Sequence, residues 1–120
     1  LRPSLFLDVT EQWPLSEAAA VFSANMVHIS PWACTLGLLD GASRVLPIGG
    51  PLVLYGPFRR HGRHTATSNE SFDAWLKSQD PSWGVRDLET VEQEALSRGL
   101  VLTDNVQMPA NNRTVVFRKA

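Results

Sequence analysis

The chain has 120 residues, of which 43% are hydrophobic, and its 11 basic and 12 acidic side chains give a formal net charge of −1. This length predicts a single domain over residues 1–120 with a sizeable core, and the hydrophobic fraction argues against a disordered chain. The balanced charge provides no field that would attract nucleic acid or an anionic membrane, so neither is expected as a partner.

Cysteine usage and hydropathy narrow the class of protein further. A single cysteine, Cys34, excludes an internal disulfide and a cysteine-based zinc cluster. Such usage is typical of the reducing cytoplasm, which is the expected location. No apolar run approaches the roughly 20 residues that a membrane-spanning helix needs, so no such helix is expected.

The first part of the chain predicts two short strands and a helix. Apolar runs at 5–9 and 20–24 predict strands, the second of them buried on both faces. Ser30 and Pro31 predict a helix start, because a serine side chain caps a free backbone N–H and proline loses no hydrogen bond at the first helical position. Apolar residues at helical spacing extend this helix to Leu46.

A third buried strand is predicted at 52–55, and it leads into a polar loop at 58–68 that is rich in arginine and histidine. A loop of this length in a compact domain is often functional, but its basic side chains are equally consistent with a solvated surface. Thr67 and Glu70 have the spacing of a capping box, which predicts a helix start there and an end near Gln79.

The last part of the chain predicts a helix and a closing hairpin. Asp87 is placed to cap a helix that presents Leu88, Val91, Ala95 and Leu96 to the core and is terminated by Gly99. Apolar runs at 100–108 and 114–117 predict two antiparallel strands. The predicted order is therefore β, β, α, β, α, α, β, β. It is typical of an α/β fold with a mostly parallel sheet, a C-terminal antiparallel hairpin and helices on both faces.

The stretch from Asn25 to Trp32 is the candidate functional segment. It follows a predicted strand, and ligands of open α/β sheets gather at the carboxyl ends of the strands. Asn25 and His28 are therefore predicted as the polar groups on the floor of a binding crevice. The alternative is that both side chains only satisfy backbone groups of a loop in the core.

Several catalytic signatures are absent from the sequence. It contains no G-x-G-x-x-G turn, no phosphate-binding P-loop and no G-x-S-x-G nucleophile elbow. His28, His61 and His64 do not have the spacing of a strong zinc pattern, so no metal is expected.

Longer motifs run in order through nearly the whole chain: N-M-V-H-I-S-P-W (25–32), G-G-P-L-V-L-Y-G-P-F (49–58), G-R-H-T (62–65), S-N (68–69), D-P-S-W-G-V-R-D (80–87) and M-P-A-N-N (108–112). Together they resemble a largely uncharacterised family of class I S-adenosylmethionine-dependent methyltransferase-like proteins. The resemblance implies a Rossmann-like methyltransferase sheet and S-adenosylmethionine as the cofactor.

The resemblance also implies roles for particular residues. In that family the Gly-rich cofactor turn lies on the first two strands, so this chain is expected to be a truncated, C-terminal portion that begins at the third strand. By their match to the family motifs, the implied residues are Asp8, Asn25 and Met26 for the cofactor, Tyr55, Phe58 and Arg63 for the substrate, and His28 or His64 as a general base on the acceptor.

The implied sheet has the strand order 3-2-1-4-5-7-6, so the absence of the first two strands would uncover an edge of the strand at 20–24. An open apolar edge is a template for pairing with another strand. Either the strand at 5–9 is expected to cover this edge, or two chains are expected to form a homodimer through it.

The expected function is that of a methyltransferase-like domain whose family transfers a methyl group to a small-molecule acceptor, and which is inactive alone because the cofactor-binding half is absent. The alternative is a non-catalytic, dimeric binding or interaction module derived from a methyltransferase. The third interpretation is that the chain is a fragment without selected activity. The absence of a Gly-rich turn from these 120 residues favours the second interpretation for this polypeptide.

Overall fold

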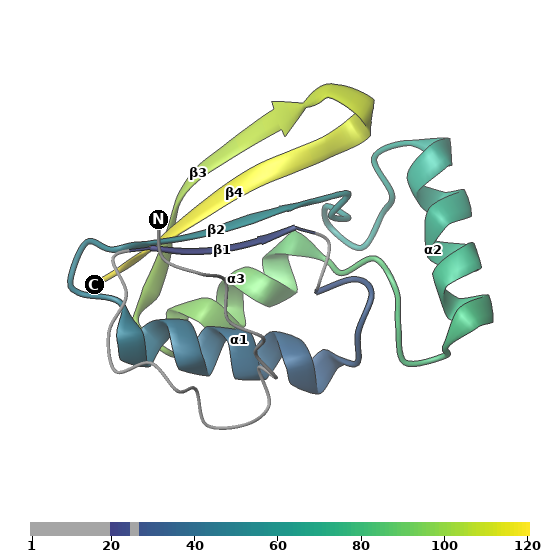
Figure 1. Ribbon diagram of the computed structural model, residues 1–120. Helices are drawn as coiled ribbons and strands as arrows, with labels where there is room; N and C mark the ends of the chain where they lie inside the picture. The colour runs from purple at the N-terminus through teal and green to yellow at the C-terminus, as the bar shows by residue number, and fades with distance from the viewer. Residues whose placement is uncertain (1–19, 25–26) are drawn as a thin grey trace, which may run out of the picture.

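The computed structural model describes residues 20–24 and 27–120. Its elements in chain order are β1 (Val21–Ala24), α1 (Trp32–Val45), β2 (Pro51–Gly56), α2 (Thr67–Gln79), α3 (Leu88–Leu96), β3 (Leu100–Met108), the short 3-10 turn η1 (Pro109–Asn111) and β4 (Asn112–Lys119). Figure 1 shows α1 and α3 packed along the sheet and α2 standing beyond the ends of β1 and β2. The predicted strand at 5–9 lies outside the described residues.

The four described strands form one mixed sheet with the order β1-β2-β4-β3. β1 and β2 are parallel, whereas β4 is antiparallel to both of its neighbours. This confirms the α/β class and the C-terminal antiparallel hairpin, and the order is that of the last four strands of the sheet implied by the resemblance. The described part is not mostly parallel, because β4 lies between β2 and β3. β1 forms an edge of the described sheet, and pairing along it stays a prediction.

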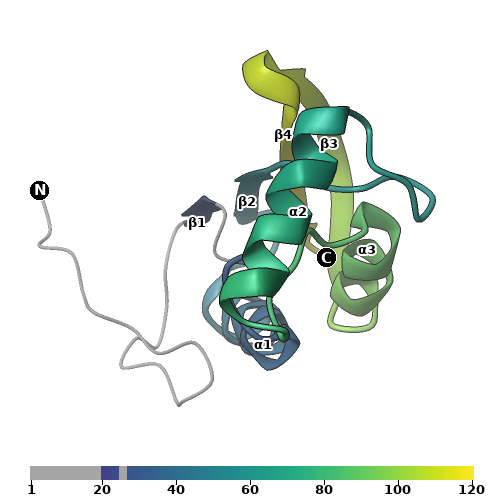
Figure 2. The same ribbon diagram turned by 90° about the vertical axis from the view of Figure 1, so that its right-hand side faces the viewer.

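The core lies between one face of the sheet and the two helices α1 and α3. Alternate residues of β2 are buried, and these residues face the helices because successive side chains of a strand point to opposite faces. The fully buried members of this layer are Leu39 and Ala42 of α1, Leu52 of β2, Val91 and Ala95 of α3, Leu100 of β3, and Val115 and Phe117 of β4. Figure 2 shows α1 and α3 on the same side of the sheet. The prediction of helices on both faces is not confirmed by the described residues.

The helix starts differ from those predicted. α1 begins at Trp32 with Pro31 at the N-cap and no side-chain cap, and the carbonyl of Pro31 accepts a hydrogen bond from the Cys34 N–H. The predicted capping box is wrong, because Thr67 is the first helical residue of α2 and Ala66 is its N-cap. Asp87 is the N-cap of α3 as predicted, but its carboxylate binds Arg59 instead of a backbone N–H.

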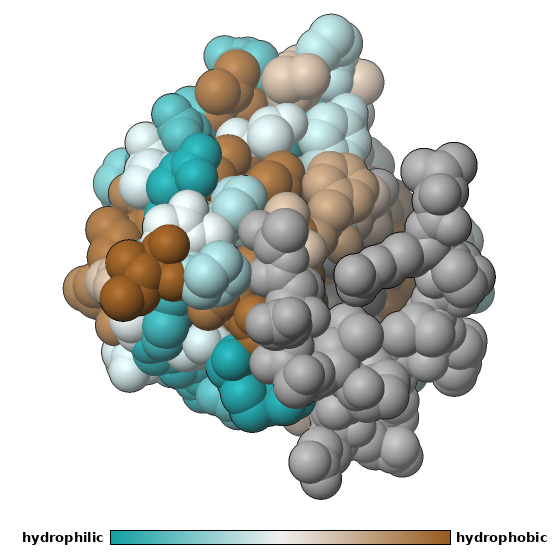
Figure 3. Space-filling model, turned by 60° about the vertical axis from the view of Figure 1, so that its left-hand side comes forward, coloured by the Kyte–Doolittle hydropathy of each residue, from teal (hydrophilic) through white to brown (hydrophobic). Residues whose placement is uncertain are grey.

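Exposed apolar side chains are scattered over the surface. Figure 3 shows apolar patches separated by hydrophilic residues on the face that it presents. The large exposed side chains include Phe22, Ile48, Trp75, Leu96 and Val106. They come from different elements, and the most exposed of them, Ile48, lies in the turn between α1 and β2.

We expect Leu39→Ala to lower the free energy of unfolding by about 2–5 kcal/mol, because the deleted side chain leaves a cavity in the layer between α1 and the sheet. Leu39 is 0% exposed, whereas Ile48 is 84% exposed, so Ile48→Ala is the control. Its effect should stay within about 0.5 kcal/mol. Urea unfolding of both variants measures the difference, and equal losses would contradict the placement of Leu39 in the core.

Candidate functional site

Three segments meet at the carboxyl edge of the two parallel strands. These are the residues after β1 from 27 to 31, the loop after β2 from 57 to 66, and the segment 80–87 that precedes α3. α2 crosses in front of the strand ends at this edge (Figure 2). Open α/β sheets bind ligands at this edge, so the polar groups gathered there are the candidates for function.

His28 is buried at this edge with 0% exposure. Its Nδ1 accepts a hydrogen bond of 3.0 Å from the backbone N–H of Arg86, and its carbonyl accepts one of 2.9 Å from Gly84. The ring meets the ring of Phe58 edge-on, with 4.6 Å between the centroids. Burial, followed by the nearby charge of Arg86, lowers the pKa of His28 to about 3. His28 is therefore a neutral group that holds segment 80–87 against β1, and this environment favours a structural role.

Asp73 of α2 forms the second buried polar centre. One carboxylate oxygen accepts a hydrogen bond of 2.8 Å from the Val85 N–H, and the other lies 3.2 Å from Nε2 of His64 and 3.1 Å from Nζ of Lys77. Burial alone would raise the pKa of Asp73, but the hydrogen bonds from Val85 and Lys77 and the charges of Lys77 and His64 hold it below its usual value. Asp73 is therefore an ionised carboxylate that joins α2 to two loops.

Segment 80–87 passes close to Asp73 at Gly84. A Cβ placed on Gly84 would lie 3.0 Å from Oδ1 of Asp73 and 3.1 Å from Cε of Lys77, which is tighter than most Cβ contacts. A larger residue at this position would therefore require the side chains of Asp73 and Lys77 to shift by a few tenths of an ångström.

His64 has the geometry of an oriented imidazole. Its side chain is 18% exposed, Nε2 faces the carboxylate of Asp73, and Nδ1 is buried with no partner among the described residues. A carboxylate on one ring nitrogen fixes the orientation of a histidine and leaves the other nitrogen for proton transfer.

The residues predicted to bind substrate are not brought together. Tyr55 is half-buried on β2 and alternates with the buried Leu54, so its side chain lies on the face of the sheet opposite the core. Phe58 is 1% exposed and belongs to the core, where it contacts His28. Arg63 is exposed at a tight turn, in an isolated bridge with Arg60. The predicted cofactor residues Asp8, Asn25 and Met26 lie outside the described residues.

Two arginines of the basic loop after β2 are paired with carboxylates at the start of α3. Arg59 pairs with the carboxylate of Asp87 at 3.1 Å, and Arg60 pairs with Glu89 at 2.6 Å. Glu89 also accepts a hydrogen bond from the backbone of His61. The acids at the start of α3 therefore neutralise the first two arginines of the loop and fix its position.

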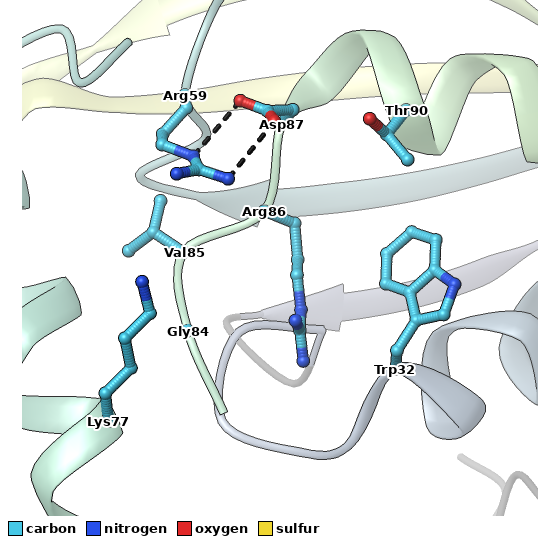
Figure 4. A pocket seen from close by; sticks show the side chains of 8 residues that line it. All are labelled: Trp32, Arg59, Lys77, Gly84, Val85, Arg86, Asp87 and Thr90. Atoms are coloured by element: carbon cyan, nitrogen blue, oxygen red, sulfur yellow. Dashed lines mark hydrogen bonds and ion pairs between the residues drawn. The ribbon is translucent and has the colours of Figure 1, made fainter. Parts of the chain in front are cut away.

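A pocket of about 270 Å³ opens between the three helices (Figure 4). It is lined by Trp32, Arg59, Lys77, Gly84, Val85, Arg86, Asp87 and Thr90. Trp32 belongs to the stretch that the sequence predicted as a crevice floor, but the other lining residues were missed. They come from segments far apart in sequence, and the signals that pointed to them were the motif at 80–87 and the arginine-rich loop that contains Arg59.

Arg86 is the central cation of this pocket. Its guanidinium donates to the carbonyl oxygens of Val27, Ser30 and Ser82 at 3.0, 2.7 and 2.8 Å, and it lies over the Trp32 ring at 5.5 Å from the centroid. Burial lowers the pKa of Arg86 below its ordinary value. Its acceptors in the described chain are neutral, which sets it apart from Arg59 and Lys77.

Residues 20–24 and 27–120 contain no group of three or more histidine, cysteine, aspartate or glutamate side chains placed to hold a metal ion. No helix in the same part of the chain is long and apolar enough to cross a membrane.

The pH dependence of stability tests the role of His28. The unfolded state binds a proton near pH 6.5 and the folded state only near pH 3, so stability is lost as the pH falls between these values. We expect His28 to account for a loss of about 2 kcal/mol between pH 7.5 and pH 5. His28→Asn keeps an acceptor for the Arg86 N–H and should flatten this dependence in urea unfolding. The exposed His61 supplies the control His61→Asn, which should retain the dependence; a slope unchanged in His28→Asn would exclude the proposed environment.

Replacement of Asp73 tests the link between α2 and segment 80–87. Asp73→Asn removes the charge that Lys77 and His64 face, and we expect a loss of about 2 kcal/mol in the free energy of unfolding. Amide hydrogen exchange should show faster exchange of the Val85 N–H. Asp104→Asn, at an exposed position on β3, is the control and should leave that exchange rate unchanged. Equal protection of Val85 in the two variants would contradict the link.

The fold is similar to that of several solved proteins. An O-methyltransferase family 2 protein from Planctomyces limnophilus in complex with apigenin matches with a TM-score of 0.80 and 18% identity, over 94% of this chain and 33% of that chain. CalO1, a methyltransferase of calicheamicin biosynthesis in its SAH-bound form, matches with a TM-score of 0.78 and 17% identity, over 97% and 34%. A protein described as a pericyclic reaction enzyme matches with a TM-score of 0.76 and 18% identity, over 95% and 29%.

These likenesses show a methyltransferase-like fold, and the chain spans about a third of the length of each of the three proteins. The sequence itself is matched by one family model over residues 1–119, nearly its whole length. The chain belongs to the DUF938 family, whose members are described as proteins of unknown function.

Proposed function

We propose that this chain forms the acceptor side of an S-adenosylmethionine-dependent methyltransferase and that the groups that hold the cofactor lie outside its described residues. The observation that carries this proposal is the structural similarity to two methyltransferases, at TM-scores of 0.78 and 0.80 over 97% and 94% of the chain. In this proposal the chain alone transfers no methyl group.

The described residues do not fit a cofactor site. A Rossmann-like sheet holds its cofactor at a Gly-rich turn between the carboxyl end of a strand and the start of a helix. In the described chain the glycine pair Gly49–Gly50 precedes β2, at the opposite edge of the sheet. Asp8, Asn25 and Met26 therefore remain proposals for cofactor contact that rest on the family resemblance alone.

His64 is the better proposal for a general base. The carboxylate of Asp73 holds Nε2, so Nδ1 would be the atom that takes a proton from an acceptor oxygen or nitrogen. His28 is less suited, because it is buried and its Nδ1 accepts the Arg86 N–H. Tyr55 and Arg63 stay proposals for acceptor contact at the same edge. Methyl transfer depends chiefly on the alignment of the acceptor with the sulfonium of the cofactor. The loops that contain these residues would therefore contribute by positioning the acceptor.

A non-catalytic binding or interaction module, dimeric through the edge of β1, is the second candidate. The observation that favours it is that residues 20–24 and 27–120 carry no Gly-rich turn between the carboxyl end of a strand and the start of a helix. One fold hosts several chemistries, so fold alone does not fix methyl transfer.

Calorimetric titration of S-adenosylhomocysteine into the 120-residue chain tests the cofactor part of the proposal. We expect no heat of binding and no change in melting temperature at high ligand, because the described residues lack the turn that would hold the cofactor. Binding at micromolar affinity, about −8 kcal/mol, would contradict the proposal.

Where the gene encodes residues before residue 1, the same titration on that longer product separates the two candidate functions. Micromolar binding of S-adenosylhomocysteine there, with none in the 120-residue chain, supports the acceptor-side proposal. Absence of binding in both favours the interaction module. Light scattering at high concentration tests the dimer, and a monomer would exclude it.

A further inference from the structure

We propose that the pocket between Trp32, Lys77 and Arg86 is a binding site for a small aromatic carboxylate. The proposal does not depend on methyl transfer, since it rests on the charges, shape and aromatic wall of the pocket. Each of these features points to a different part of the ligand.

The described residues leave the charge of the pocket unbalanced. The carboxylate of Asp87 neutralises Arg59 through two contacts of 3.1 Å, and the carboxylate of Asp73 neutralises Lys77 at 3.1 Å. Arg86 donates only to neutral carbonyl oxygens in the described chain. Three cations and two carboxylates leave one positive charge, so a ligand with a single negative charge would complete the balance. A partly desolvated cation favours such a partner more strongly than an exposed one.

The walls of the pocket suit a planar group. The Trp32 indole forms one side with the guanidinium of Arg86 beside it, and Figure 4 shows Arg86 and Trp32 extending alongside each other into the same space. Aromatic rings pack favourably on indole faces and edges and on the planar guanidinium. Thr90 lies on α3 across the pocket, where its hydroxyl offers a further polar contact.

The size of the pocket sets the size of the ligand. Its volume of about 270 Å³ lies just below the range of roughly 300–1,000 Å³ that is usual for sites of drug-sized molecules. A single aromatic ring with one carboxylate is small enough for a pocket of this volume. Nε and Nη2 of Arg86 already donate to backbone carbonyl oxygens, so the two N–H groups of Nη1 are the donors left for a carboxylate.

The test uses benzoate as the probe and ¹⁵N-labelled protein observed by NMR. Benzyl alcohol and benzylamine have the same ring with no charge and with a positive charge. We expect saturable shifts of the Trp32 indole N–H and the Thr90 amide on addition of benzoate, with a Kd of about 1 mM. Benzyl alcohol should bind at least about tenfold more weakly, which is about 1.4 kcal/mol, and benzylamine should not shift these signals. The amide of the distant Ile48 reports nonspecific effects.

Two variants locate the binding. Arg86→Gln should abolish the preference for benzoate over benzyl alcohol, and Arg118→Gln is its matched control. Arg118 is an exposed arginine that donates to the carbonyl of Gly49 at the opposite edge of the sheet, so its loss should leave benzoate binding unchanged. If Arg86→Gln fails to fold, Trp32→Leu takes its place and should weaken benzoate binding severalfold.

Three results would overturn the proposal. The first is that benzoate shifts neither signal at concentrations of about 10 mM, where a millimolar site would be largely occupied. The second is that all three probes bind equally, which would show a ring site without charge selectivity. The third is an equal loss of binding in Arg86→Gln and Arg118→Gln, which would show a general electrostatic effect. None of these results depends on cofactor binding, so failure of the benzoate proposal can be distinguished from failure of the proposed function.

Discussion

The ionised carboxylate of Asp73 is the interaction on which the arrangement of the site depends. A buried charge is costly unless donors surround it, and Asp73 has a backbone N–H, an ammonium group and an imidazole as neighbours. Through these contacts one residue of α2 fixes the loop after β2 and segment 80–87. The buried Leu76 on the same helix adds an apolar anchor. The position of α2 is thus set by a few side chains, whereas α1 and α3 are held by an extended apolar layer.

Most polar groups at the carboxyl edge are used to hold the chain together. His28 accepts from Arg86, Asp87 pairs with Arg59, and Glu89 pairs with Arg60. This explains how a loop with several basic residues contributes little free charge to the edge. It also sets Arg86 apart from the other cations around the pocket, because its guanidinium donates hydrogen bonds only to carbonyl oxygens in the described chain.

The order of elements after residue 20 could be predicted from the sequence because apolar periodicity and turn residues are local signals. The helix over 88–96 and the hairpin agree with the structure for this reason. The candidate site could not be predicted in the same way. Lys77 and Arg86 line the same pocket as Trp32 but come from segments that are far from it in sequence. A local sequence pattern carries no information about such a long-range contact. The capping box predicted at Thr67 and Glu70 is wrong, because Ala66 takes the N-cap position. Thr67 and Glu70 have the spacing of a capping box, but Thr67 is the residue after the N-cap.

The position of β4 has a consequence for how the protein is made. β4 lies between β2 and β3 and supplies Val115 and Phe117 to the core, where both are 0% exposed. During synthesis, β1, α1, β2, α2, α3 and β3 leave the ribosome before the strand that joins them. β2 and β3 then have no shared neighbour, and the apolar residues of α1 and α3 face an incomplete sheet. Native packing therefore has to wait for the last strand to emerge, and until then the nascent chain presents apolar surface that chaperones recognise.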